Sequence, residues 1–208
     1  MMPAPHLTAE LMAKPLLTAL LIGLFIVVMV TLNLRGCQKA SARRHRRYRT
    51  KAERVIQRLP QLSGDAQRLA YLRKINPYVF EELLLLAFER QGYPIVRNAS
   101  YSGDGGLDGQ VFIDGQRYLI QAKRYGKTIT PAHIQQFGAL LLRERCGGFF
   151  IHTGRTGELS RSLLRAHPQI QLISGQRLLD LLNGKASWEA VSFTPFKSQR
   201  SQSDASSL

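Results

Sequence analysis

The sequence is poor in cysteine. Its 208 residues include only Cys37 and Cys146, which are far apart in the chain. Two such residues make no disulfide framework, so a reducing compartment is the simpler expectation. No group of histidine and cysteine residues has the spacing of a zinc site. The chain also lacks an internal repeat, which excludes a repeat architecture.

Acidic residues are scarce as well. Asp and Glu number 14 against 29 Lys and Arg, for a formal charge of +15. An excess of this size is typical of proteins whose partners are polyanions, either nucleic acid or anionic lipid. Part of it is concentrated in residues 35–51, which carry eight positive charges and no acid. The length allows one domain of ordinary size plus an appendage.

An uncharged apolar stretch covers residues 15–34. As a helix it would span roughly 30 Å, the hydrocarbon thickness of a bilayer. We therefore expect a short extracytoplasmic segment at 1–14, a transmembrane helix at 15–34 and a basic juxtamembrane segment at 35–51. The basic segment would stay on the cytoplasmic side and lie against anionic headgroups, with a DNA-binding arm as the alternative. This predicts a single-pass protein of the bacterial inner membrane with a cytoplasmic C-terminal domain.

The remainder reads as a helical linker at 52–76, a folded domain at 77–185 and a tail at 186–208 that is disordered at its end. A helix is predicted from Pro77 to Gln91, because an apolar face recurs at helical spacing and Gly92 follows it. Later segments alternate between strands and helices, which favours parallel pairing. The expected strands are 93–98, 108–113, 116–123, 148–153 and 169–173, and the expected helices are 131–145, 158–166 and 176–182.

The Asp114-Gly115 pair between two of these strands is a strong hairpin signal. An antiparallel hairpin beside parallel strands predicts a mixed α/β sheet flanked by helices. A two-residue turn here would place Asp108 opposite Gln121, with Lys123 on the same face. A carboxylate, an amide oxygen and an ammonium group in one place suit a hard divalent cation such as Mg²⁺ and its phosphate substrate.

Five segments carry a family resemblance: FEELLLLAFERQGY (80–93), SGDGGLDG (102–109), QAKRY (121–125), GGFFIHTG (147–154) and QLISGQRLLDLL (171–182). Together they resemble the Mrr-type restriction endonuclease domain, a branch of the PD-(D/E)xK nucleases in which the second half-motif often reads Gln-x-Lys. The resemblance covers about residues 77–182. It implies a restriction-endonuclease-like fold and a Mg²⁺-dependent endonuclease that hydrolyses DNA phosphodiester bonds, with Mn²⁺ as a substitute ion.

Carried over by position, the resemblance implies that Asp108 and Gln121 are metal ligands, that Lys123 is the catalytic lysine and that Glu81 is an auxiliary acid at the metal. Glu82, its neighbour, is then expected to be a solvated helix charge. Asp104 is either a further site residue or a turn residue.

Basic residues near the expected strand ends are candidate phosphate contacts, with solvated loop residues as the alternative. They are Arg124, Lys127 and Arg155. The histidines suggest no metal site: His133 and His167 are expected at the surface and His152 in the core or at its rim.

The expected partners are DNA, the membrane through residues 15–51, and a second copy of the chain, since cutting both strands needs two active sites. A non-catalytic nucleic-acid-binding or interaction module on the same fold, in a membrane-associated complex, is the alternative to an enzyme. No added recognition module is visible, which predicts an activity that is either weakly sequence-specific or dependent on self-association.

Overall fold

The computed structural model describes residues 15–98 and 107–189, apart from the side chains of 15–17 and 34–41. Asp104 lies outside the described residues. The chain divides into two compact units, Met1–His45 and Arg46–Leu208. A single helix, α2 (Pro15–Arg58), begins in the first unit and ends in the second.

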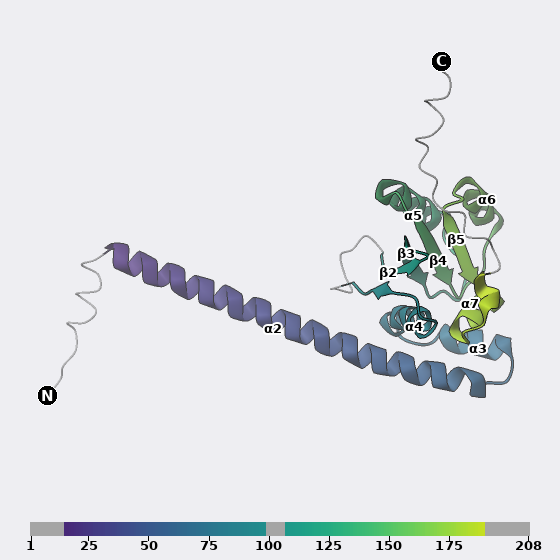
Figure 1. The fold of residues 1–208 in the computed structure, drawn as a ribbon, viewed down its shortest axis with the longest axis horizontal. Helices are drawn as coiled ribbons and strands as arrows, with labels where there is room; N and C mark the ends of the chain where they lie inside the picture. Colours follow the sequence, from purple (N-terminus) through teal and green to yellow (C-terminus); the bar gives the residue numbers. More distant parts are fainter. Residues whose placement is uncertain (1–14, 99–106, 190–208) are drawn as a thin grey trace, which may run out of the picture. The chain divides into compact units, whose positions relative to one another are not determined.

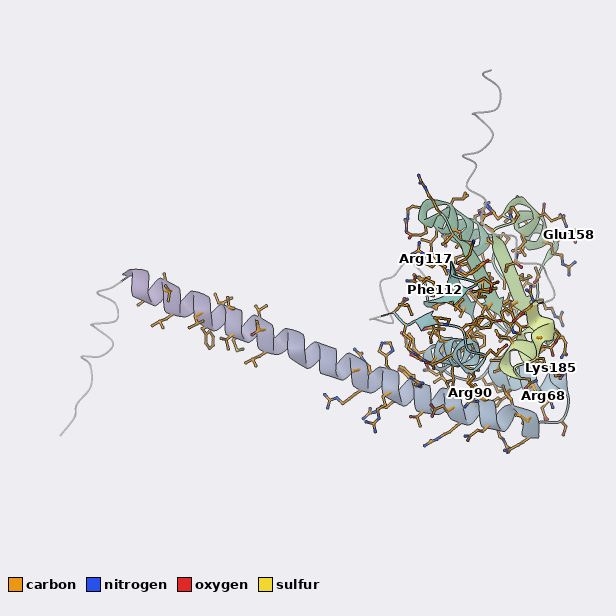
Figure 2. The ribbon with its side chains drawn as sticks, viewed as in Figure 1. Arg68, Arg90, Phe112, Arg117, Glu158 and Lys185 are labelled. Atoms are coloured by element: carbon orange, nitrogen blue, oxygen red, sulfur yellow. The ribbon has the colours of Figure 1, made fainter. Side chains whose placement is uncertain are left out.

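In the first unit, α2 exposes its described apolar side chains. Leu20 is 67% exposed, Phe25 65% and Leu32 55%, and the side chains extend from the ribbon on all sides (Figure 2). Among the described residues, no helix is both long and apolar enough to cross a membrane. The part of the apolar stretch whose side chains are described, 18–33, is shorter than the roughly 20 residues that a spanning helix needs. The transmembrane helix predicted for 15–34 is therefore not supported.

The last turns of α2 belong to the second unit and pack into its core. Ala52 and Val55 are at most 5% exposed, and they join the same apolar cluster as the helices that follow. After α2 come a short 3₁₀ helix, η1 (Leu59–Gln61), and α3 (Asp65–Leu72). The region predicted as a helical linker is thus helical and contributes buried side chains to the domain.

The second unit is built around a five-stranded mixed sheet in the order β1-β2-β3-β4-β5. The strands β1, β2 and β3 pair antiparallel, whereas β3, β4 and β5 pair parallel. The mixed sheet expected from the sequence is confirmed. The bounds are β1 (Ile95–Val96), β2 (Gly109–Ile113), β3 (Gln116–Lys123), β4 (Gly147–His152) and β5 (Ile170–Ser174).

The hairpin between β2 and β3 has the predicted register. Ile113 pairs with Gln116, and Gly109 pairs with Ile120. Asp114 and Gly115 both adopt positive φ angles, 50° and 74°, as a two-residue type I′ turn requires. The register follows from this turn, and it fixes which residues of β2 and β3 lie opposite each other.

Helices cover both faces of the sheet (Figure 1). One face packs against α4 (Pro77–Arg90) and α7 (Gly175–Leu182), and the other packs against α5 (Pro131–Glu144) and α6 (Glu158–Ala166). A final 3₁₀ helix, η2 (Ala186–Glu189), brings the fully buried Trp188 into the first of these two layers. The strand β3 alternates between the layers, because Ile120 contributes to one apolar cluster and Leu119 to the other.

Candidate active site

Asp108 lies directly before β2 and is bound to β3 twice. Its backbone N–H donates to the carbonyl of Ile120 at 2.9 Å. Its carboxylate oxygen Oδ2 accepts a hydrogen bond from the backbone N–H of Ala122 at 2.6 Å. These two bonds join Asp108 to β3 on either side of Gln121, so the register expected for the hairpin continues as far as Asp108.

Gln121 and Lys123 lie in the last half of β3, next to the central strand β4. Gln121 is 5% exposed and pairs with Phe150, while Lys123 is partly exposed and pairs with His152. The carbonyl of Lys123 also accepts a hydrogen bond from the N–H of Thr153, at 3.3 Å. Gln121, with its buried amide, and Lys123, with its more accessible ammonium group, therefore both lie at the carboxyl end of β3. Neighbouring segments are hydrogen-bonded to this end of the strand on both of its edges.

Glu81 comes to this place from α4. The helix starts at Asn76, whose side chain accepts a hydrogen bond from the N–H of Tyr78 at 3.0 Å, and Pro77 occupies its first turn. The pKa of Glu81 is raised from 4.5 to about 8: burial contributes most, the negative charge of Asp108 also raises the pKa, and the positive charge of Lys123 partly offsets both. The charges of three sequence-predicted residues thus act on one another, although they come from three different elements.

Glu82 does not have the solvated position expected for it. It is 1% exposed, and its Oε2 accepts a hydrogen bond from Nε of Arg97 at 3.1 Å. Arg97 also bonds to Glu89 at 3.0 Å, and Glu89 in turn pairs with Arg49 at 3.0 Å. The expectation failed because the partner of Glu82 is on another element, just past β1. This network secures α4 directly beside Glu81.

The candidate phosphate contacts differ in their surroundings. Arg124 is partly buried, and its Nη1 donates to the carbonyl of Arg73, so it supports the loop before α4. Lys127 and Arg155 are exposed, and the N–H of Arg155 donates to the carbonyl of Lys127 at 3.2 Å. Two exposed cations therefore lie on adjoining backbone segments just beyond the carboxyl ends of β3 and β4.

Gly154 makes the close approach of these two segments possible. A Cβ atom at this position would lie 2.2 Å from the carbonyl oxygen of Lys127 and 3.0 Å from the Cβ of Tyr125. The same segments are joined by a parallel bridge between Thr128 and Arg155. The sequence showed a glycine after a strand, but nothing in it indicated which backbone would pack against that glycine.

The donor atoms at this site suit a hard divalent cation. Within residues 15–98 and 107–189, no group of three or more His, Cys, Asp or Glu side chains is placed to hold a metal. The predicted set is of another kind, since it consists of the carboxylates of Asp108 and Glu81 and the amide oxygen of Gln121. Mg²⁺ is commonly bound by only one or two carboxylates and completes its coordination with water and substrate phosphate. The residues present therefore fit such an ion.

The comparison with protein families agrees with this geometry. The family model described as a restriction endonuclease, of the Mrr catalytic type, matches residues 72–182, which is more than half of the chain. No curated protein and no solved structure matches the chain. The matched region runs from the end of α3 to the end of α7, so it includes the whole sheet and every site residue named above. The chain therefore belongs to the restriction endonuclease family of the Mrr catalytic domain.

Proposed function

We propose that this protein is a Mg²⁺-dependent endonuclease that hydrolyses DNA phosphodiester bonds, with Mn²⁺ able to replace Mg²⁺. The observation that carries the proposal is the position of the Asp108 carboxylate, which is hydrogen-bonded to the backbone of β3 between Gln121 and Lys123 and whose charge, like that of Lys123, acts on Glu81 of α4. If Glu81 had only a structural role on α4, its carboxylate could face solvent at no cost in stability. A partly buried carboxylate that is influenced by both another carboxylate and a lysine suits a site that binds a cation and a phosphate together.

The roles of the residues follow from their chemistry. Asp108, Glu81 and Gln121 would hold the ion, which when bound supplies an activated water and offsets the charge that builds on the phosphate. Lys123, more accessible than Gln121, would orient the attacking water and donate to a phosphate oxygen. Glu81 would release its proton when the ion binds, because metal ligands act in their deprotonated form.

The substrate is proposed to be DNA contacted through its backbone. Lys127 and Arg155 are exposed beyond the same strand ends as Lys123, where they could neutralise neighbouring phosphates. Contacts of this kind position a duplex without reading its sequence. Cleavage of both strands would then require two copies of the site, which is the reason to propose a homodimer on the substrate.

We also propose that α2 attaches the protein to the cytoplasmic face of the bacterial inner membrane, through residues 15–34 and the basic segment 35–51. The support is the exposure of consecutive apolar side chains from Leu20 to Ile22 and from Leu24 to Val30, which leaves this part of the helix without a polar face. A basic segment directly after it would favour anionic lipid. Sedimentation of the protein with membranes after a high-salt and alkaline wash would support attachment, and complete release into the supernatant would contradict it.

The nuclease proposal is tested by incubating the purified full chain with supercoiled plasmid. Nicked and linear products should form with Mg²⁺ or Mn²⁺ and should disappear when a chelator is added. DNA binding without cleavage under every metal condition would instead favour the non-catalytic binding module. Products that form equally well in the chelator would contradict the assigned metal chemistry.

A further inference from the structure

The loop that follows β3 is held rigidly beside Lys123. Thr153, which is 1% exposed, accepts a hydrogen bond at its hydroxyl oxygen from the N–H of Tyr125 at 3.0 Å. The same hydroxyl donates to the carbonyl of Tyr125 at 2.9 Å. The hydroxyl group of one buried side chain thus binds both backbone groups of Tyr125, which lies two positions after Lys123.

Tyr125 in turn holds His133. Its hydroxyl lies 2.9 Å from Nδ1 of His133, and the two rings are stacked with their centroids 5.9 Å apart and their planes 7° from parallel. His133 lies in the first turn of α5, where the backbone N–H groups of a helix favour negative charge. The hydrogen bond and the stacking contact with Tyr125 together orient the imidazole ring of His133.

The imidazole is available as a neutral donor. Burial lowers the pKa of His133, and the positive charge of Lys123 lowers it further, so the neutral ring is favoured near pH 7. When the Tyr125 hydroxyl donates to Nδ1, the proton of the ring is on Nε2. Within the part of the chain that the structure describes, Nε2 of His133 makes no hydrogen bond, and the side chain is partly exposed.

We propose that His133, oriented by Tyr125, binds a phosphate of the nucleic-acid backbone through its Nε2–H, beside the phosphate that Lys123 contacts. This rests on the proposed nuclease function, and it adds a binding residue that the Gln-x-Lys motif does not include. The exposed cations Lys127 and Arg155 follow on the same side of the site, so the backbone of a bound strand would meet a neutral donor and then two charges.

A neutral donor and a cation leave different signatures in binding. A lysine that contacts a phosphate releases a counterion, so its removal weakens binding and lowers the slope of log K against log salt concentration by about 1. A neutral imidazole releases none. Loss of its hydrogen bond to a charged phosphate should weaken binding by about tenfold and leave the slope unchanged.

The experiment measures binding of the full chain to a fluorescent DNA duplex by anisotropy over a series of salt concentrations. Ca²⁺ replaces Mg²⁺ so that binding is measured apart from turnover. His133→Phe keeps a ring to stack on Tyr125 but removes both nitrogens, and His133→Gln returns an N–H donor near the position of Nε2. We expect a tenfold loss for His133→Phe at constant slope, and partial recovery for His133→Gln.

Two controls separate this result from a general loss of structure. His167→Phe makes the same change in another partly buried histidine that precedes β5, at the opposite end of the parallel strands, and it should bind as the wild type does. Lys127→Ala should weaken binding and reduce the slope. If His133→Phe does not fold, as judged by thermal melting, Tyr125→Phe takes its place, since it keeps the stacking ring and removes only the hydroxyl. Its expected loss is several-fold.

Unchanged affinity in the folded His133→Phe or Tyr125→Phe protein would overturn the proposal, and so would a reduced salt slope. A wild-type protein that binds DNA but never cleaves it would refute the nuclease function alone, because the His133 contact could still be measured. A wild-type protein that binds no DNA would overturn both.

Discussion

The carboxylate of Asp108 accepts a hydrogen bond from the backbone N–H of Ala122, the residue between Gln121 and Lys123, at 2.6 Å. This bond gives Asp108 a structural role as well as its proposed role at the metal. The two roles can be separated, because asparagine retains an oxygen acceptor for the Ala122 N–H but has no charge.

Asp108→Asn should therefore fold normally and bind Mg²⁺ poorly. We expect its melting temperature in chelator to lie close to that of the wild type and its Mg²⁺ affinity, measured by calorimetry, to fall by at least about tenfold. Asp108→Ala removes the acceptor too and should show both defects. Equal Mg²⁺ affinity in the wild type and Asp108→Asn would exclude Asp108 as a ligand.

The raised pKa of Glu81 should make the stability of the metal-free protein depend on pH in an unusual way. Its pKa is about 8 in the folded chain and 4.5 in the unfolded chain, mainly because of burial. Between these values the folded state holds a proton that the unfolded state has lost, so stability falls as the pH rises through this window. Above pH 8 the destabilisation is complete.

Glu81→Gln should flatten this slope, because glutamine does not ionise. Melting curves in chelator at several pH values test it, with Glu158→Gln as a control in an exposed helix carboxylate. The wild type and the control should lose stability between pH 5 and 8 relative to Glu81→Gln. Parallel curves for all three proteins would show that Glu81 ionises normally.

Arg97 is predicted to be a strong determinant of stability. Its removal would take away the guanidinium that pairs with the carboxylate of Glu82, whose side chain is only 2% exposed. Arg97→Ala should then lower the free energy of unfolding by about 3 kcal/mol in urea denaturation. Arg49→Ala, which removes a more exposed pair with Glu89, should cost less than about 1 kcal/mol. Similar small losses for both variants would contradict the role assigned to the Arg97 network.

Gly154 should not tolerate a side chain. The added Cβ of Gly154→Ala would meet the carbonyl oxygen of Lys127 at 2.2 Å and force the two segments apart, which should cost about 1 to 3 kcal/mol. The displaced loop carries Lys127 and Tyr125, so DNA affinity should fall as well. Gly126→Ala is the matched control in the same loop, because nothing lies within 4 Å of its added Cβ. Equal stability and equal DNA affinity in the two variants would contradict the requirement for glycine at position 154.

The parts of the site that the sequence predicted are those set by local rules. The Asp114-Gly115 turn determines the register of β2 and β3, and this register brings Asp108 to the end of β3, where its carboxylate accepts a hydrogen bond from the N–H of Ala122. The parallel half of the sheet followed from the alternation of strands and helices in the same way. The family resemblance supplied Glu81, whose approach to the hairpin no local pattern indicates.

The parts that could not be predicted depend on contacts between distant residues. Glu82 and Arg97 belong to different elements, and only the folded chain shows that they pair. His133 was expected at the surface because it lies on a helix, but Tyr125 reaches it from the loop after β3. The last turns of α2 likewise join the core through apolar residues in a segment that reads as mostly polar.

The proposed active site is tested most directly by cleavage of supercoiled plasmid by Lys123→Met under single-turnover conditions with Mg²⁺. Lys185→Met serves as the control, because it makes the same change at an exposed lysine after α7. Lys123→Met should bind the plasmid but cleave it at least about 100-fold more slowly, while the control should cleave at the wild-type rate. Cleavage by Lys123→Met at the wild-type rate would contradict the assignment of this site as the active site.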